Sequence, residues 1–323
     1  MTSNSVDFTV AIPTYNGSNR IPKLLEALRA QINTDDFTWE VIIVDNNSSD
    51  NIKEVFEGQK THWRSDCSLK YTFEQQQGLA FARQAAVEQS RGTFVGFLDD
   101  DTIPNSDWVS AAYHFGIQHP KIGAFGGQIH GAFETKPPKN FERIQSFLAI
   151  KEHGPTPKQF NPNVLFLPAG AGLIIRKQAW VESVPRKLAR TTRGGNDFEI
   201  SIHLYRAGWE IWYNPDLHIV HEIPSWRLEP DYLLKLSDTV GSCICELRII
   251  NSHKKQRPLV FLKVLLGSFK RVIFHWAKYR KQLSTDVVAA CEMTFFVSAL
   301  LSPFEFIKSS LRAKLLANFC NSE

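Results

Sequence analysis

The chain has 323 residues, of which 43% are hydrophobic and 22% are charged. These fractions are typical of a globular protein and exclude a chain that is disordered over most of its length, and 323 residues can bury one large core or two smaller ones. The formal net charge is +4, and charge alone does not choose between a nucleic acid, an anionic lipid and an acidic polymer as partner.

Positive charge is concentrated towards the end of the chain. Residues 231–323 carry 14 Lys/Arg against 7 Asp/Glu, whereas residues 1–230 carry 23 against 26. The five cysteines show no paired metal-type spacing beyond one C-x-C, which is typical of reduced thiols in a cytosolic protein. The opening MTSNSVDFTVAIP is too polar for a secretory signal, so we expect a cytoplasmic location.

Apolar, β-branched runs alternate with amphipathic stretches over the first hundred residues. The expected strands cover residues 8–12, 39–44, 69–73 and 93–98, and the expected helices cover residues 21–31, 52–57 and 79–89. This order predicts an α/β fold with a Rossmann-like, mostly parallel central sheet flanked by helices. Ligands of such sheets bind beyond the carboxyl ends of the strands, so the residues after each strand are where chemistry is expected.

Polar segments follow all four strands: PTYNGSNR, DNNSSD, EQQQG and DDDTIP. Because the carboxyl ends of parallel strands meet at one edge, these segments predict a single polar, acidic cleft. The first segment holds one glycine, Gly17, and lacks G-x-G-x-x-G, which disfavours a nicotinamide or flavin domain.

Three acidic residues, Asp99, Asp100 and Asp101, come directly after the fourth expected strand. Unopposed carboxylates this close together repel one another unless a cation lies among them. Hard oxygen ligands suit Mg²⁺ or Mn²⁺, which also bind substrate phosphates, so a diphosphate is the natural second ligand. A solvated acidic turn that caps the next helix is the alternative that the residues leave open.

Two further strand ends carry candidate ligand-binding residues. Asp45 ends the second strand and is expected to bind a base or ribose, or to cap the following helix. Gly78 permits a close backbone approach, and Arg83 lies on the first turns of the next helix. Arg83 is expected to reach a phosphate or ribose; a helix-surface arginine is the alternative.

The second half of the chain begins with a helix expected at residues 107–119 and a strand near residues 122–126, and is then predicted to be irregular to about residue 168. A later helix is expected at residues 197–207, with Asp197 at its start. The helix dipole favours the ionised carboxylate there, which is what a general base needs. The alternative role of Asp197 is that of a helix cap.

Short strands expected at residues 210–213 and 217–220 bring two histidines near the second strand's end. His218 and His221 are three residues apart and therefore lie on opposite faces of an extended strand. We choose His221 as a third metal ligand, and a structural histidine remains the alternative.

Four residues are candidate contacts for an acceptor. Trp226 and Arg227 are suited to stack on a sugar or grip a phosphate, unless the tryptophan belongs to a core. Gly170 and Gly172 in PAGAG offer a smooth backbone to a sugar ring, or form a tight turn before a strand.

Taken in order, six motifs over residues 7–228 resemble those of family 2 glycosyltransferases, which have the GT-A fold. They are VAIPTYN, VDNNSSD, Q-x-G-L-A-x-A-R, FLDDD-x-x-P, GAG-x-x-I-R and NDFEISIHLYRAGW. The processive branch of that family carries Q-x-x-R-W, whereas this chain has IPSWRLE, which disfavours processive polymerisation. Within the family the chain resembles bacterial polysaccharide-assembly enzymes, in particular the cyanobacterial hormogonium polysaccharide type.

The resemblance implies roles for particular residues. The nucleotide is held by four strand-end residues, which are Pro13, Tyr15, Asn16 and Asp45. The cluster Asp99–Asp101 holds ribose and metal, with Asp101 as the direct ligand of Mg²⁺ or Mn²⁺. Asp197 is the catalytic base, with Asn196 in place of the usual acidic neighbour.

The resemblance also implies a reaction and its partners. The reaction is an inverting single displacement from a nucleotide diphosphate sugar to a saccharide or lipid-linked saccharide acceptor. We expect no nucleic-acid partner. A non-catalytic sugar-nucleotide-binding or scaffold subunit is the alternative from another class of protein.

The domain organisation follows from these motifs. Residues 1–228 are predicted to form the GT-A domain, with a nucleotide-binding half at 7–127 and an acceptor half at 128–228, and residues 229–323 to form a helical extension. Residues 258–281 mix Leu, Phe and Trp with Lys and Arg, as in a helix that lies in a membrane interface.

Residues 287–301 are apolar apart from Glu292 and fall short of the roughly 20 residues that a spanning helix needs. We therefore expect peripheral contact of the extension with the inner membrane surface. Packing of these helices on the catalytic domain or on a second subunit is the alternative.

Overall fold

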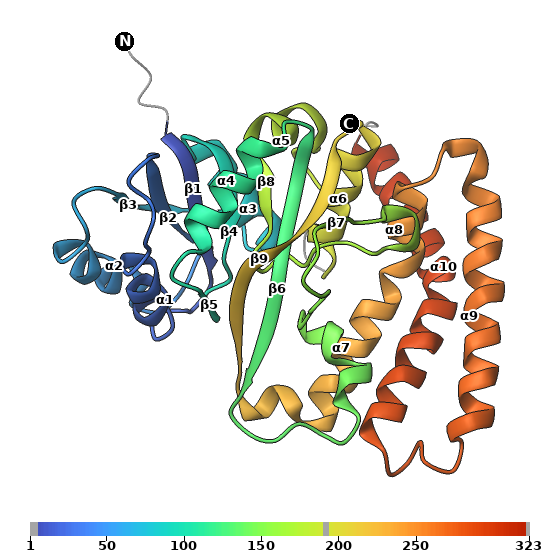
Figure 1. Cartoon of the computed structure of the whole chain (residues 1–323). Coiled ribbons are helices and arrows are strands. Elements are labelled where there is room, and N and C mark those ends of the chain that lie inside the picture. Colours follow the sequence, from blue (N-terminus) through green and yellow to red (C-terminus); the bar gives the residue numbers. More distant parts are fainter. Residues whose placement is uncertain (1–5, 190–193, 321–323) are drawn as a thin grey trace. The chain divides into compact units, whose positions relative to one another are not determined.

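The computed structural model describes residues 6–189 and 194–320, with side chains described through residue 308. The chain forms two compact units, whose elements are labelled in Figure 1. The first unit comprises Met1–Glu134 and Ala149–Ile223, and the second unit comprises Thr135–Leu148 and Pro224–Glu323. This division differs from the predicted boundary at residue 228: the second unit takes in Thr135–Leu148 from within the predicted GT-A domain, and its later part begins at Pro224. The predicted division into nucleotide and acceptor halves stays a prediction.

Strands of the first unit form one sheet, in the order β3-β2-β1-β4-β8-β6-β9-β5, with β7 paired to β9. The strands are β1 (Val6–Thr14), β2 (Trp39–Asp45), β3 (Ser68–Phe73), β4 (Gly92–Phe97), β5 (Thr102–Pro104), β6 (Ile122–Phe133), β7 (Lys158–Gln159), β8 (Ile174–Arg176) and β9 (Glu210–Ile223). The neighbours β3, β2, β1 and β4 are all parallel, and β6 is parallel to β9. The strands β5, β7 and β8 pair antiparallel with their neighbours.

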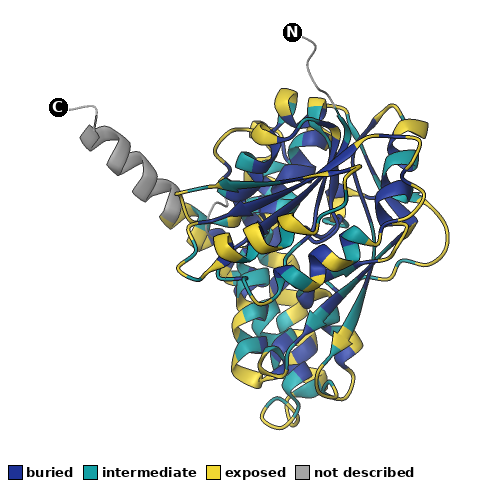
Figure 2. Cartoon of the chain, turned by 90° about the vertical axis from the view of Figure 1, so that its left-hand side faces the viewer, coloured by how far each residue is buried: buried dark blue, intermediate teal, exposed yellow. Residues whose placement is uncertain are grey.

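Helices cover both faces of this sheet. They are α1 (Ile21–Arg29), α2 (Ile52–Thr61), α3 (Leu79–Gln89), α4 (Trp108–Gln118), α5 (Lys177–Ser183) and α6 (Asn196–Arg206), with a short 3-10 helix η3 (Pro162–Val164). Alternate residues of β1 enter two different cores: Val10 packs with α1 and α4, whereas Ala11 packs with α3, α5 and α6. Burial on both faces explains the continuous apolar runs of the strands, which Figure 2 shows largely in the colour of buried residues.

The predicted α/β fold with a mostly parallel central sheet is confirmed, and the first four strands and three helices lie where the sequence predicts them. Two strand predictions were wrong. β9 is one strand of 14 residues rather than two short ones, because a register shift between Gly126 and Gln128 of β6 accommodates the break at Pro215. β6 runs to Phe133, seven residues beyond Gly126 where the prediction ended, because it stays paired with β9 to Ile223.

The second unit is helical. Its elements are η1 (Phe141–Arg143), η2 (Gln145–Leu148), η4 (Ser225–Leu228), α7 (Pro230–Ser242), α8 (Ile244–Ile250), η5 (Lys254–Gln256), α9 (Arg257–Tyr279) and α10 (Val287–Cys320). The two long helices α9 and α10 run side by side (Figure 1). Arg143 of η1 forms an ion pair with Glu292 of α10, which ties the inserted segment to these helices.

Among the described residues, one helix is long and apolar enough to cross a membrane by length and composition alone. The window Val287–Lys308 of α10 meets this criterion, and 39% of the window is buried. The apolar segment predicted from sequence stopped at residue 301, whereas the helix continues beyond it. Core helices of soluble proteins meet the same criterion, so α10 alone is weak evidence for a membrane-spanning helix.

Candidate active site

The acidic run after β4 is bound to the turn after β1 through its middle residue. Asp100 accepts hydrogen bonds from Arg20 Nε and Nη2, each at 2.9 Å, and from Thr14 Oγ1 at 2.6 Å. A Cβ atom on Gly17 would lie 2.1 Å from Thr14 Oγ1 and 2.2 Å from Asp100 Oδ2, so this turn requires glycine. Arg20 was not predicted as a site residue, although this arginine ends the motif PTYNGSNR. Asp100 was predicted to bind the nucleotide sugar, and that role stays a prediction.

The first acid of the run faces a buried arginine. Arg83 is 1% exposed, its Nη2 lies 3.6 Å from Asp99 Oδ1, and its Nη1 donates to Asn196 Oδ1 at 2.5 Å. Burial raises the pKa of the Asp99 carboxyl, and the charge of Arg83 offsets part of that rise. The guanidinium therefore connects the end of β4 to the start of α6. Its predicted contact with a phosphate or ribose stays a prediction.

Asp197 lies in the first turn of α6, after Gly195 with its left-handed φ of 94°. Its Oδ2 accepts a hydrogen bond from the backbone N–H of Gly170 at 2.8 Å. Gly195, rather than Asp197, occupies the helix-capping position. The Gly170 N–H thus orients the carboxylate beside the Arg83 and Asn196 pair. The predicted role of Asp197 as general base stays a prediction.

A lysine that sequence analysis missed lies near this carboxylate. Lys151 Nζ donates to the carbonyl of Leu167 at 3.1 Å and lies 4.8 Å from the centre of the Phe198 ring. Burial lowers the pKa of Lys151, and the charge of Asp197 opposes that shift. The lysine comes from the segment predicted to be irregular, where no motif marks it.

Gly170 and Gly172 are each required by the structure, for different reasons. A Cβ atom on Gly170 would lie 2.2 Å from Arg83 Nη2, so the guanidinium fills the space that a side chain would need. Gly172 has a φ of 70°, in the left-handed region that favours glycine. Contact of either glycine with an acceptor sugar stays a prediction.

The third acid of the run meets a histidine across two strands. β5 pairs with β9 so that Thr102 lies opposite His221, which brings Asp101 Oδ2 to 3.4 Å from His221 Nε2. The short strand β5 was not predicted, and it creates this proximity. The expectation that the two histidines lie on opposite faces is confirmed, because His218 Nδ1 instead contacts His130 Nε2 at 2.9 Å.

The donor atoms at Asp101 and His221 are of two kinds: the carboxylate suits Mg²⁺ or Mn²⁺, whereas the imidazole nitrogen is a softer donor. A carboxylate oxygen and an imidazole nitrogen lie adjacent there, and both side chains are largely buried. No group of three His, Cys, Asp or Glu residues arranged to hold a metal exists in the part of the chain that the structure describes. A single carboxylate such as Asp101, completed by substrate phosphates and water, matches the way proteins bind Mg²⁺. That Asp101 and His221 are the ligands stays a prediction.

The residues predicted to hold the nucleotide lie at the ends of β1 and β2. Asn16 has a left-handed φ of 50°, and its side chain accepts from Ser49 N at 2.8 Å. Asp45 accepts from Tyr71 Oη at 2.6 Å and from Ser48 N at 2.9 Å. These bonds order the two loops beside each other, and Tyr71 is a partner that sequence analysis missed.

The three remaining nucleotide candidates differ in exposure. Pro13 is buried within β1, whereas Tyr15 is 51% exposed and offers its ring to a ligand. Gly78 has a φ of 137° and donates its N–H to Asn46 Oδ1 at 2.7 Å, which sets the start of α3. Their contact with a nucleotide stays a prediction.

Trp226 and Arg227 lie in the second unit, on η4. The half-exposed Trp226 ring packs edge-on against the Tyr232 ring, with 5.0 Å between the ring centres. The Arg227 guanidinium lies 5.3 Å from the centre of the Trp226 ring. The alternative of a buried core tryptophan is thus excluded, since the side chain is 50% exposed. Their predicted role in acceptor binding stays a prediction.

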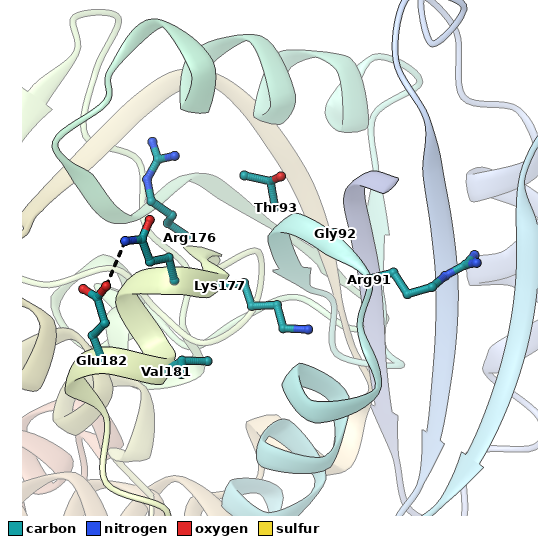
Figure 3. A pocket seen from close by; sticks show the side chains of 8 residues that line it. Arg91, Gly92, Thr93, Arg176, Lys177, Val181 and Glu182 are labelled. Carbon is teal, nitrogen blue, oxygen red and sulfur yellow. Dashed lines mark hydrogen bonds between the residues drawn. The ribbon is translucent and has the colours of Figure 1, made fainter. Parts of the chain in front are cut away.

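A cavity of about 480 Å³ lies at the other end of β4, around Gly92 and Thr93 (Figure 3). Its cationic side chains are already engaged: Arg91 with Glu40 at 2.8 Å, Arg176 with the Ile122 carbonyl at 2.9 Å, and Lys177 with the Ser90 carbonyl at 2.5 Å. The acidic run follows the opposite end of the strand. This cavity is therefore not the candidate site.

Known proteins share the sequence pattern and the fold. AglE, a glycosyltransferase of Haloferax volcanii, is 36% identical over 110 residues, which are 34% of this chain and 35% of AglE. This chain therefore matches about a third of the length of that relative. The succinoglycan biosynthesis protein ExoM of Rhizobium meliloti is 23% identical over 240 residues, or 73% of each chain.

Structural similarity extends over nearly the whole chain. The mannosyltransferase PcManGT of Pyrobaculum calidifontis, solved in complex with GDP-Man and Mn²⁺, matches with a TM-score of 0.61 and 16% identity over 94% of this chain and 88% of that one. This likeness confirms the predicted GT-A fold. In sequence, residues 9–180, more than half of the chain, match the family described as glycosyl transferase family 2. The chain therefore belongs to glycosyl transferase family 2.

Proposed function

We propose that the protein is an inverting, metal-dependent glycosyltransferase that moves a sugar from a nucleotide diphosphate sugar to an acceptor hydroxyl. The observation that carries this proposal is a continuous set of contacts at one edge of the sheet. Asp101 lies beside His221, Asp99 faces Arg83, and Arg83 holds the residue before Asp197. The proposed site for a metal and diphosphate and the candidate base Asp197 are thereby connected through the acidic run and Arg83.

Asp197 takes the proton in this mechanism. The Gly170 N–H engages one carboxylate oxygen, and the other receives the proton of the acceptor hydroxyl. The hydroxyl oxygen then attacks the anomeric carbon as the bond to the diphosphate breaks, so the configuration at that carbon inverts. Mg²⁺ or Mn²⁺, held by Asp101 and His221, would supply charge neutralisation on the departing diphosphate.

The relatives support the partners in this proposal. PcManGT was solved with GDP-Man and Mn²⁺, and ExoM is named for succinoglycan biosynthesis. We accordingly propose a nucleotide sugar donor and a saccharide or lipid-linked saccharide acceptor in polysaccharide or glycoconjugate biosynthesis. The narrower resemblance to hormogonium polysaccharide enzymes stays a prediction.

The test is thermal unfolding in the presence of UDP, GDP or ADP, with and without Mn²⁺. A nucleotide at a hundred times its Kd stabilises the folded protein by about 2.7 kcal/mol, which raises the Tm of a domain of this size by several degrees. We expect a Mn²⁺-dependent rise with one nucleotide that Asp101→Asn removes. The matched control is Asp216→Asn, an exposed carboxylate on the same strand as His221.

The alternative, a non-catalytic sugar-nucleotide-binding or scaffold subunit, gives different results. A scaffold shows no rise with any nucleotide. A binding subunit shows the rise but no release of nucleoside diphosphate from the matching nucleotide sugar, in the presence or absence of acceptors. Either result would remove the proposed activity.

We also propose that the second unit attaches peripherally to the anionic inner face of the cytoplasmic membrane. Exposed apolar side chains of α9 recur every three or four residues and form what we call the α9 stripe: Leu259, Leu262, Leu266, Phe269, Ile273 and Trp276. Between Leu247 and Thr285 the sequence has ten Lys/Arg and no Asp/Glu. An apolar stripe within a purely basic segment suits an interfacial helix on anionic lipid.

Cosedimentation of the full chain with phosphatidylglycerol vesicles tests this attachment. The double variant Leu266→Glu with Phe269→Glu is expected to abolish binding, whereas Ile117→Glu, which alters an equally exposed apolar residue of the first unit, is expected to leave it intact. Binding that survives the double variant would refute the attachment. A dimer that the double variant dissociates would instead assign the α9 stripe to a second copy of the chain.

A further inference from the structure

One short segment beside the candidate base is bound at both of its ends by charged side chains. Residues 167–169 belong to no helix or strand. At one end, the carbonyl of the buried Leu167 accepts a hydrogen bond from Lys151 Nζ at 3.1 Å. At the other end, the N–H of Gly170 donates to Asp197 Oδ2 at 2.8 Å. An ammonium and a carboxylate therefore determine where this segment lies.

Lys151 is itself anchored to the sheet. Its backbone N–H donates to the Ile129 carbonyl at 3.0 Å, and its carbonyl accepts from the Ile129 N–H at 2.9 Å. These two bonds pair the residue with β6. Its Nζ lies 4.8 Å from the centre of the Phe198 ring, next in sequence to Asp197. All of these residues belong to the first unit, so the cation that binds the segment extends from a fixed point of the sheet.

Charge also links Lys151 to Asp197 directly. Burial lowers the pKa of Lys151, and the negative charge of Asp197 opposes that shift. The attraction is mutual, so it draws the Asp197 carboxylate towards the ammonium. Lys151 thus acts on Asp197 in two ways, by charge and through the segment that ends at the Gly170 N–H.

We propose that Lys151 is a positioning residue for Asp197. Its ammonium fixes the Leu167 end of the segment, so the Gly170 N–H meets Asp197 Oδ2 at a constant place. The other carboxylate oxygen is then left in the orientation in which it receives a proton. In this role Lys151 affects turnover only through Asp197. The effect on turnover rests on the proposed function, whereas the effect on the segment does not.

The test compares two variants that each remove one ammonium group. Lys151→Met keeps most of the side-chain volume, and Lys158→Met is the matched control. Lys158 is also partly buried, lies beside aromatic rings and donates to a backbone carbonyl, that of His153, at 2.7 Å. Burial, and then the charges of Lys151 and Lys158, lower the pKa of His153 to about 4, so each variant removes one of these charges. The variants differ in whether the lost ammonium binds the segment that orients Asp197.

Hydrogen exchange of the full chain, followed by mass spectrometry, measures the segment without any need for turnover. A buried Leu167 carbonyl without its partner costs free energy, so the segment opens more often. We expect the amide of Gly170 to exchange about tenfold faster in Lys151→Met than in wild type. Lys158→Met is expected to leave this exchange unchanged. Equal exchange in the two variants would overturn the proposal.

Release of nucleoside diphosphate from UDP-glucose, UDP-GlcNAc and GDP-mannose, with water as acceptor, measures the action of the base. We expect kcat to fall about 10- to 100-fold in Lys151→Met, because a misplaced carboxylate takes up the proton less well. The KM for the donor and the nucleotide-dependent rise in Tm should stay the same, and Lys158→Met should keep the wild-type kcat.

A kinetic double-mutant cycle separates positioning of the base from a general structural role. In an Asp197→Asn background, Lys151→Met should leave the residual kcat unchanged, since the base on which Lys151 acts is already lost. A lysine that only supports the fold would instead lower kcat by the same factor in both backgrounds, and that result would refute the proposal.

The exchange and turnover readouts also separate this proposal from the proposed function. Absence of both the nucleotide-dependent rise in Tm and the release in wild type, with faster Gly170 exchange in Lys151→Met, would remove the reaction and leave Lys151 as the residue that fixes the segment beside Asp197. Turnover by wild type, with exchange and kcat both unaltered in Lys151→Met, would keep the reaction and overturn the role of Lys151.

Discussion

Gly170→Ala is the substitution that most directly tests the contact network at the candidate active site. A Cβ atom at this position would lie 2.2 Å from Arg83 Nη2 and 2.9 Å from both Cζ and Nη1. Carbon contacts relax to about 3.5 Å, so the guanidinium must move by about 1 Å. Its 2.5 Å bond to Asn196 would then exceed hydrogen-bonding distance.

The change in the free energy of unfolding caused by Gly170→Ala follows from two opposing effects. Overpacking of a buried site costs about 1–3 kcal/mol, and a lost hydrogen bond to a charged group costs about as much. These costs overlap, because displacement of Arg83 is how the clash is relieved. The lower entropy of the unfolded alanine variant offsets about 0.4–1 kcal/mol. We therefore expect a net loss of about 2 kcal/mol in the free energy of unfolding of the first unit.

Urea unfolding and a double-mutant cycle measure this effect. Gly58→Ala in α2 is the control, since its Cβ meets nothing within 4 Å, and it is expected to stabilise by about 0.5–1 kcal/mol. In an Arg83→Met background the clash is absent, so Gly170→Ala should cost about 1–2 kcal/mol less. An equal cost in both backgrounds would refute the reasoning. Turnover should fall about 100-fold, since the Asn196 end of α6 positions Asp197.

Three further outcomes are expected. Asp197→Asn keeps the Gly170 contact but removes the base, so kcat in nucleoside diphosphate release should fall by about 10²–10⁴ with nucleotide binding unchanged. EDTA should abolish the nucleotide-dependent rise in Tm, and Mn²⁺ should restore it. Burial chiefly lowers the pKa of His153 from 6.5 to about 4, so only the unfolded chain binds this proton between those values, and stability falls as the pH drops through that window. His153→Phe should therefore lessen the fall, measured by urea unfolding on both sides of pH 6.5.

The sheet was predictable because its strands are buried on both faces. Such strands are continuous apolar runs, and the segment around Val41 to Val44 is fully buried in the structure. Their carboxyl ends could be found from the runs alone, which located Asp45 and the acidic run. β9 was different, because Pro215 interrupts its pattern and only pairing with β6 keeps the strand continuous.

Partners distant in sequence were not predictable from local patterns. Arg83 has the sequence position of a helix-surface residue, yet its guanidinium is buried and donates a hydrogen bond to Asn196, 113 residues later. Lys151 lies in a segment without regular periodicity, and its ammonium contacts the Leu167 carbonyl and the Phe198 ring, which the local sequence does not reveal. Thr14 and Arg20 stand within a recognised motif, but their common partner Asp100 is 80 or more residues away.

Buried Arg83 has a consequence for how the proposed reaction is organised. Arg83 is 1% exposed and therefore loses the water contacts of its guanidinium. Its Nε has no hydrogen-bond partner among the described residues, so burying this side chain costs free energy. What it gains is contact with both Asp99 and Asn196. The acid run and the start of α6 are therefore held in fixed relation by one cation. Placement of the proposed base Asp197 relative to the proposed donor site then depends on the folded core rather than on a loop, which favours a pre-organised site over one assembled on substrate binding.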